Sequence, residues 1–264
     1  MSTLETRRIV KRYQSRTVVD GISLTVDTGS VVGLLGPNGA GKTTTFYSIV
    51  GFIRPDQGQV LLDGEELTRL PIHRRARQGL SYLAQDASVF KKLTVRENAA
   101  IVLEALGLPP AEVRERTEQL MRELKLEHLA DNLGQALSGG ERRRVEIMRA
   151  LATRPRFILL DEPFAGIDPL SIIDLQKIIR SLRDQGLGVL ISDHNVRETL
   201  SVCDYAYIVN AGAILAQGTA QEVIASEVVR KMYLGENFSM ELAQKFLQWV
   251  RSQALPAHPF TRPV

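Results

Sequence analysis

The sequence has little cysteine, few aromatic residues and no long apolar run. Cys203 is the only cysteine, which excludes an internal disulfide and a cysteine-based metal cluster. No apolar segment approaches the roughly 18 residues that a membrane-spanning helix needs. The first residues, MSTLETRRIVKR, also lack the apolar centre of a signal peptide. These absences predict a cytoplasmic protein that reaches a membrane only through a partner.

The chain also lacks a large excess of either positive or negative charge. The formal net charge is +3 over 264 residues, an excess too small to predict nucleic-acid binding. Hydrophobic residues make up 44% of the chain, which is ordinary for a globular protein and sufficient for a large core. We therefore expect one large domain or two small ones, and no nucleic acid as partner.

Strand-like and helical patterns alternate along most of the chain. Residues 17–36 and 58–67 resemble strands and turns, with breaks expected at Gly21 and Gly29. After residue 138 a helix, a strand over 156–162, a second helix and a strand over 187–193 follow one another, and 205–218 resembles a hairpin. This alternation predicts an α/β fold with a mainly parallel sheet. We expect Asp168 and Pro169 to be the N-cap and the first residue of the second helix, which ends near Gly186, and Asp193 could cap the helix that follows the strand over 187–193.

Residues 94–133 have a different character. Thr94 and Glu97 have the spacing of a capping box, and residues 109–126 are charged and amphipathic with prolines at their start. We expect a small helical subdomain, at about residues 94–150, inserted into the α/β body.

The segment GPNGAGKT, residues 36–43, matches the complete P-loop pattern between a predicted strand and a predicted helix. Its glycines allow backbone N–H groups to surround phosphate oxygens. Lys42 would supply a positive charge to the β- and γ-phosphates, and the Thr43 hydroxyl would ligate Mg²⁺. An ordinary glycine turn is the alternative. The predicted ATP-binding residues here are Gly36, Pro37, Asn38, Gly39, Ala40, Gly41, Lys42, Thr43 and Thr44.

Polar residues at the ends of later strands complete a candidate catalytic site. Asp161 ends an apolar strand and is expected on the Mg²⁺ side, while Glu162 could act as general base for a water molecule. A solvated pair of loop acids is the alternative. His194 also follows a strand, where open α/β sheets bind ligands, and could contact the γ-phosphate.

Two further positions give weaker signals. Gln85 ends a short apolar run before the helical insertion and could reach the metal ion or the water. Tyr13 could stack on a nucleotide base, or it could be an ordinary surface aromatic.

The stretch LSGGERRR, residues 137–144, has two interpretations. Ser138 and Glu141 form a capping box, and the helix N-terminus with Gly139 and Gly140 could also bind an anion. Because the P-loop already surrounds one set of phosphates, the second site makes best sense facing the ATP of another subunit. We assign Arg142–Arg144 to the helix surface and an interface, and not to catalysis.

Taken together, these motifs resemble the ATP-binding cassette family over about residues 4–240. The resemblance identifies GPNGAGKT as the Walker A motif, FILLDE as Walker B and LSGGE as the signature motif. It further implies that Gln85 is the Q-loop residue, Asp168 the D-loop aspartate, His194 the switch histidine and Tyr13 the adenine-stacking aromatic. It also implies a head-to-tail homodimer with two ATP molecules, Mg²⁺ held by Thr43, Gln85 and Asp161, and an antiparallel β subdomain.

Within the family, stretches such as DHNVRETL and YLGENF are similar to ATPase subunits that drive lipopolysaccharide export. That resemblance implies membrane-embedded permease partners in a groove near Gln85, Phe90 and Leu93, with the chain peripheral on the cytoplasmic face of the inner membrane. A branched-chain amino-acid importer subunit is the main alternative. A soluble cassette acting on ribosomes or DNA, and a regulator without turnover, are less favoured.

Three features depart from the usual pattern. Ala84 replaces a frequent proline, Met148 replaces a small residue, and the chain continues over residues 241–264 as an extension without an assigned role.

Overall fold

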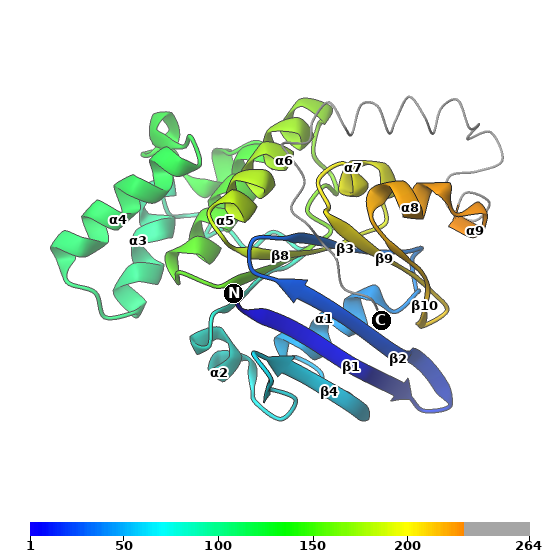
Figure 1. Cartoon of the computed structure of the whole chain (residues 1–264). Helices are drawn as coiled ribbons and strands as arrows, with labels where there is room; N and C mark the ends of the chain where they lie inside the picture. Colours follow the sequence, from blue (N-terminus) through cyan, green and yellow to red (C-terminus); the bar gives the residue numbers. More distant parts are fainter. Residues whose placement is uncertain (230–264) are drawn as a thin grey trace.

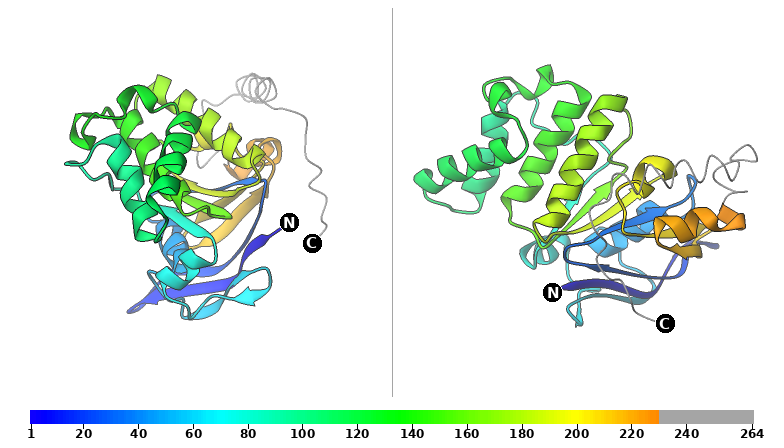
Figure 2. Two further views of the ribbon diagram at one scale, coloured as in Figure 1. Left: turned by 90° about the vertical axis from the view of Figure 1, so that its left-hand side faces the viewer. Right: turned by 45° about the horizontal axis from the view of Figure 1, so that its top comes forward.

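The computed structural model describes residues 1–229, which form two β-sheets and a set of surrounding helices (Figures 1 and 2). The antiparallel sheet has the order β2-β1-β4-β5, and the larger sheet has the order β10-β9-β3-β8-β7-β6. The strands of the antiparallel sheet are β1 (Thr3–Tyr13), β2 (Arg16–Asp27), β4 (Gln57–Leu62) and β5 (Glu65–Glu66). Those of the larger sheet are β3 (Val31–Leu35), β6 (Leu80–Leu83), β7 (Phe157–Asp161), β8 (Gly188–Asp193), β9 (Tyr205–Asn210) and β10 (Ala213–Gly218).

The larger sheet is parallel from β6 to β9, and only β10 pairs antiparallel, in a hairpin with β9. The centre of this sheet is fully buried because every residue of β3, β7 and β8 is apolar, small or held in the site. The predicted fold class, a mainly parallel α/β sheet with an antiparallel β subdomain, is confirmed. The parallel register places the carboxyl ends of β3, β7 and β8 side by side, and these ends carry the candidate site.

Helices cover the sheets and extend to one side of the molecule. Helices α3 and α4 lie at the end farthest from the antiparallel sheet and pack on α5, which also contacts β6 (Figure 1). The boundaries of the helical subdomain, about residues 94–150, stay a prediction. The helices are α1 (Lys42–Val50), α2 (Ile72–Arg77), α3 (Val95–Ala105), α4 (Pro110–Glu123), α5 (Gly139–Ala152), α6 (Pro169–Asp184), α7 (Val196–Leu200), α8 (Ala220–Ala225) and α9 (Glu227–Val229), with short 3₁₀ turns at Glu127–Leu129 and Gly134–Ala136.

The local signals for helix starts are confirmed at most positions. Thr94 and Ser138 both form complete capping boxes, and Asp168 caps α6 with Pro169 as its first residue. The cap predicted for Asp193 is wrong. Helix α7 begins after Asn195, and the Asp193 carboxylate accepts a hydrogen bond from the Asn195 N–H, at 2.8 Å, before the helix starts.

The break expected at Gly21 is also wrong, because β2 continues through this residue. Ile9 and Val10, consecutive residues of β1, pair with Ile22 and Asp20 of β2. Gly21 is therefore the extra residue of a β-bulge, with a φ of +74°. The expected break at Gly29 is confirmed by a turn that follows the end of β2.

Residues 230–264 lie outside the described part of the chain. The YLGENF motif, the end of the predicted domain at residue 240 and the extension over 241–264 therefore stay predictions. Among residues 1–229, no helix has both the length and the apolarity that a bilayer crossing requires.

Candidate active site

The P-loop connects β3 to α1 and is shaped by its glycines. A Cβ atom on Gly36 would lie 2.2 Å from the Val209 carbonyl oxygen, and one on Gly41 would lie 2.5 Å from that of Val18. Gly41 is also the N-cap of α1 with a φ of +104°, a conformation that favours glycine. No side chain caps this helix, so its first N–H groups have no intrahelical partners and can bind an anion.

The Lys42 ammonium group lies within this loop. It donates hydrogen bonds to the carbonyl oxygens of Gly36 at 2.7 Å and Pro37 at 3.0 Å. Burial lowers the pKa of Lys42, while the carboxylates of Glu162, Asp193 and Asp161 oppose that change. The buried cation therefore interacts with three acidic groups at the carboxyl ends of β7 and β8.

Asp161 ends β7 with a buried carboxylate, and both of its oxygens are held. Ser192 on β8 donates to Oδ1, and the Tyr82 hydroxyl on β6 donates to Oδ2 at 3.1 Å. Burial raises the pKa of Asp161. The Thr43 side chain, half-buried in the first turn of α1, supplies the second hard oxygen donor predicted for Mg²⁺. Carboxylate and hydroxyl oxygens fit that ion.

Glu162, Gln85 and His194 come together although they are far apart in the sequence. The Gln85 side-chain amide donates to the Glu162 carboxylate at 3.0 Å, and His194 Nδ1 lies 3.4 Å from the same oxygen. Glu162 has a φ of +44°, which is uncommon for a residue with a side chain, and its N–H donates to the Ser192 carbonyl at 2.8 Å. A strained backbone at this position is typical of a functional residue.

Two predicted motifs lie together but apart from this group. Glu141 accepts hydrogen bonds from the N–H and the hydroxyl of Ser138, at 2.8 and 2.7 Å. A Cβ atom on Gly140 would lie 2.3 Å from the Ser171 hydroxyl, so the signature turn packs directly against the start of α6, where Asp168 is the N-cap. Within residues 1–229, no hydrogen bond or ion pair joins this turn to the P-loop.

Tyr13 lies at the end of β1, next to the turn into β2, and is about half-exposed. The Lys11 ammonium lies 5.6 Å from the centre of its ring. The same hairpin brings Val18 against Gly41 of the P-loop, so Tyr13 is on an element that contacts the phosphate-binding loop.

The sequence interpretation missed an ion pair that supports the site. Arg143 and Glu146, three residues apart on α5, are both buried, and their side chains pair at 3.1 Å. Arg143 also donates to the carbonyl oxygens of Ala84 and Asp161, at 2.8 and 2.9 Å. Glu146 accepts from the N–H of Ser88 at 2.6 Å. A glutamate within the otherwise apolar run after Arg144 is the one sequence signal that could have indicated this pair.

Hydrogen bonds also fix the backbone of the loop over residues 85–93, which is expected to contact the membrane partners. Asn98 at the start of α3 is fully buried and exchanges hydrogen bonds with the backbone of Phe90, at 2.9 and 3.1 Å. The Phe90 ring is 41% exposed, and the Arg149 guanidinium lies 4.2 Å from its centre. Phe90 is therefore not a core residue, whereas Leu93 is half-buried.

The Arg143–Glu146 pair provides a test of stability. We expect Arg143→Met to lower the free energy of unfolding by about 3–5 kcal/mol, because it leaves a buried carboxylate without its partner. The double variant Arg143→Met/Glu146→Met should recover part of this loss. Urea denaturation would measure all three changes.

The matched control is Lys177→Met. Lys177 and Asp174 have the same three-residue spacing on α6, but both side chains are exposed. Its removal should cost less than about 1 kcal/mol. Equal losses for Arg143→Met and Lys177→Met would contradict the structural importance of the buried pair.

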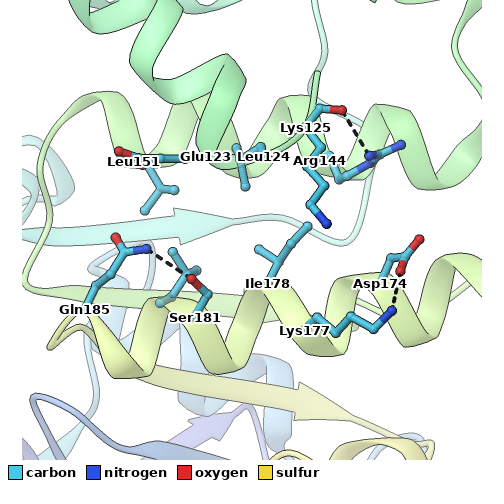
Figure 3. A pocket seen from close by; sticks show the side chains of 11 residues that line it. Glu123, Leu124, Lys125, Arg144, Leu151, Asp174, Lys177, Ile178, Ser181 and Gln185 are labelled. Carbon is cyan, nitrogen blue, oxygen red and sulfur yellow. Dashed lines mark hydrogen bonds and ion pairs between the residues drawn. The ribbon is translucent and has the colours of Figure 1, made fainter. Parts of the chain in front are cut away.

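A separate pocket of about 240 Å³ lies between the end of α4, α5 and α6 (Figure 3). Apolar side chains such as Leu124, Leu151 and Ile178 form its wall, and Lys177 pairs with Asp174 at its rim. None of the predicted site residues lines it.

The site motifs have their counterpart in a known family model. The model described as ABC transporter matches residues 19–165, which include the P-loop, Gln85, the signature motif, Asp161 and Glu162. The chain belongs to the ABC transporter family. It is therefore an ATP-binding cassette with the ATPase assignment that the sequence motifs predicted.

Individual members of the ABC transporter family match nearly the whole chain. The lipopolysaccharide export system ATP-binding protein LptB of Haemophilus influenzae is 58% identical over 241 residues, which cover 91% of this chain and 100% of that protein. LptB of Escherichia coli K12 is 56% identical over 241 residues, which also cover 91% of this chain and 100% of that protein. LptB of Acidithiobacillus ferridurans is 56% identical over 237 residues, 90% of this chain and 98% of that protein.

Solved ABC structures share the fold. MJ1267, an ATP-binding cassette of an ABC transporter in its ADP conformation, aligns with a TM-score of 0.80 and 32% identity, covering 89% of this chain and 100% of that one. CbiO1 of Clostridium perfringens, part of the ABC transporter complex cbiONQ, aligns with a TM-score of 0.78 and 27% identity, covering 92% and 98%.

Proposed function

We propose that this chain is the ATP-hydrolysing subunit of a transporter that extracts lipopolysaccharide from the inner membrane and exports it. The observation that carries the proposal is the 56–58% identity to proteins of that name, over 91% of this chain and their entire length. As a family member it works with membrane permease subunits, and the alternative cargo is branched-chain amino acids.

The geometry supports a metal-assisted attack of water on ATP. The P-loop N–H groups and Lys42 would hold the phosphates, and Thr43, Gln85 and Asp161 would hold Mg²⁺, which supplies charge neutralisation to the phosphoryl group. The Glu162 carboxylate would accept the proton of the attacking water. Gln85 and His194, which both contact that carboxylate, would orient the water and contact the γ-phosphate.

The position of the signature motif supports a homodimer. Its turn presents the N-terminus of α5, a helix of 14 residues, and it makes no hydrogen bond to the P-loop within the described chain. In a head-to-tail pair, Ser138, Gly139, Gly140 and Glu141 would therefore bind the ATP that is held by Lys42 of a second copy. Asp168, adjacent to this turn, would lie at the same interface.

The loop from Gln85 to Leu93 is the surface proposed for the membrane partners. Asn98 holds the backbone of Phe90 and Arg149 lies against its exposed ring, so a docked helix would contact a side chain whose position is fixed. The same loop begins at Gln85, which contacts Glu162. We propose that docking here places the chain on the cytoplasmic face of the inner membrane.

Co-purification tests this proposal. After co-expression with the membrane subunits of a lipopolysaccharide exporter, the chain should be recovered with them, and Phe90→Ala should reduce the recovery at least about tenfold, as expected for a central aromatic contact. Ile101→Ala on α3 is the matched control, since its side chain has the same exposed fraction, 41%. Recovery with the membrane subunits of an amino-acid importer instead would overturn the export assignment.

A further inference from the structure

Tyr82 contacts the site from a strand that no predicted motif includes. It lies on β6, three residues before Gln85, and its hydroxyl donates to Oδ2 of Asp161 at 3.1 Å. Strands β6 and β8 flank β7 on its two sides. The Asp161 carboxylate is therefore held by one hydroxyl from each neighbouring strand, Tyr82 on one side and Ser192 on the other.

The ring of Tyr82 is itself fixed by aromatic packing. Tyr47 and Phe52, at and beyond the end of α1, contact it edge-to-face with ring centres 6.2 and 5.6 Å away. Tyr47 and Phe52 also contact each other, at 5.4 Å. Three mutually packed rings leave the phenol little freedom to rotate. A tyrosine hydroxyl is protonated at neutral pH, so it can donate to a carboxylate.

Two hydrogen bonds constrain a carboxylate more than one does. A single bond from Ser192 to Oδ1 would allow the carboxylate plane to turn about the Cβ–Cγ bond. The second bond, to Oδ2 from the opposite side, stops this rotation and fixes the directions of the remaining lone pairs. Groups that hydrogen-bond to a metal-ligating carboxylate in this way set the affinity of the site.

We propose that Tyr82 is a positioning residue for Mg²⁺, acting through Asp161. The inference rests on the proposed ATPase site, because it requires Asp161 to hold the metal directly or through a water molecule. It adds a residue that lies outside the Walker motifs and that binds neither nucleotide nor metal itself.

Tyr82→Phe tests the role of the hydroxyl, since it keeps the ring and its packing. Mn²⁺, a paramagnetic substitute for Mg²⁺, would be titrated into the full chain with a saturating non-hydrolysable ATP analogue and measured by electron paramagnetic resonance. We expect the Kd for Mn²⁺ to rise about tenfold. Binding of the analogue in the presence of EDTA should be unchanged, because no hydrogen bond or ion pair within residues 1–229 joins Tyr82 to the P-loop or to Lys42.

Tyr207→Phe is the matched control. Tyr207 on β9 is a buried tyrosine whose hydroxyl accepts a hydrogen bond from the Thr25 N–H, and no hydrogen bond within the described residues joins it to Asp161. Its removal should leave the Kd for Mn²⁺ within twofold of wild type, and Tm values of the two variants show whether both are folded.

The outcomes separate this inference from the proposed function. An equal Kd for Mn²⁺ in Tyr82→Phe and wild type would overturn the role of Tyr82 while leaving the ATPase site intact. Loss of metal-free analogue binding in Tyr82→Phe would overturn it as well, since the hydroxyl would then support the fold of the site in general. Failure of wild type to form any Mn²⁺–nucleotide complex would contradict the ATPase site itself.

Discussion

Glu162→Gln is expected to reduce the rate of ATP hydrolysis by about 10³-fold, within the range that general-base catalysis contributes. The amide keeps the shape of the side chain and can still contact Gln85 and His194, but it cannot accept a proton from water. ATP binding should therefore persist. Because hydrolysis is expected to separate the two halves of the dimer, the variant should accumulate as an ATP-bound dimer.

Phosphate release and size-exclusion chromatography with ATP measure the two effects. Glu66→Gln is a suitable control, since Glu66 accepts a surface hydrogen bond from Gln59 in the antiparallel sheet, away from the site. It should behave as wild type. A Glu162→Gln chain that elutes as a monomer with ATP and hydrolyses at the wild-type rate would show that Glu162 is not the base.

Ser138→Arg is expected to lower hydrolysis at least about 100-fold while leaving ATP binding at the P-loop within about twofold. The substitution removes the cap of α5 and places a bulky cation at the helix end that is proposed to receive the partner's ATP. A hydrogen-bond donor lost from a site that stabilises transition-state charge costs about 10²–10³-fold in rate. Turnover and fluorescent-nucleotide binding would be measured on the same preparation.

Thr219→Arg separates the phosphate role of Ser138 from capping alone. Thr219 forms the same kind of capping box, with Glu222, at the start of α8. Its replacement removes an equivalent cap and should lower the free energy of unfolding by about 1 kcal/mol. Hydrolysis should then stay close to wild type. If Ser138→Arg abolished ATP binding together with hydrolysis, the signature turn would have a structural role only.

Local patterns predicted the motifs and the element types well. The capping boxes at Thr94 and Ser138 and the Pro169 helix start depend on residues within three positions of one another, and the P-loop pattern occupies eight consecutive residues. Such local signals can be recognised in the sequence without knowledge of the three-dimensional structure. The alternation of strands and helices predicted the parallel sheet, and the mostly apolar sequences of β3, β7 and β8 agree with their burial on both faces.

The residues that the sequence did not reveal act across long separations. Tyr82 meets Asp161, and Arg143 meets the backbone of Ala84, only because neighbouring strands and α5 come together in space. Tyr82 has no local pattern that distinguishes it from an ordinary strand residue, and the one local signal for Arg143 is the glutamate three residues later, Glu146. The Asp193 cap is wrong for a local reason: its carboxylate accepts a hydrogen bond from the N–H of Asn195, two residues later, and α7 begins only after Asn195.

Helix α5 has a consequence for cooperativity. It begins at Ser138, the residue proposed to face the ATP of the second copy, and Arg143 lies about 7.5 Å further along the same rigid axis. Arg143 holds the backbone at Ala84 and Asp161, which directly precede Gln85 and Glu162 of its own chain. If the ATP bound at one site displaced this helix, the displacement would change the geometry of the other site. The two ATP molecules in a dimer would therefore not be hydrolysed as independent events.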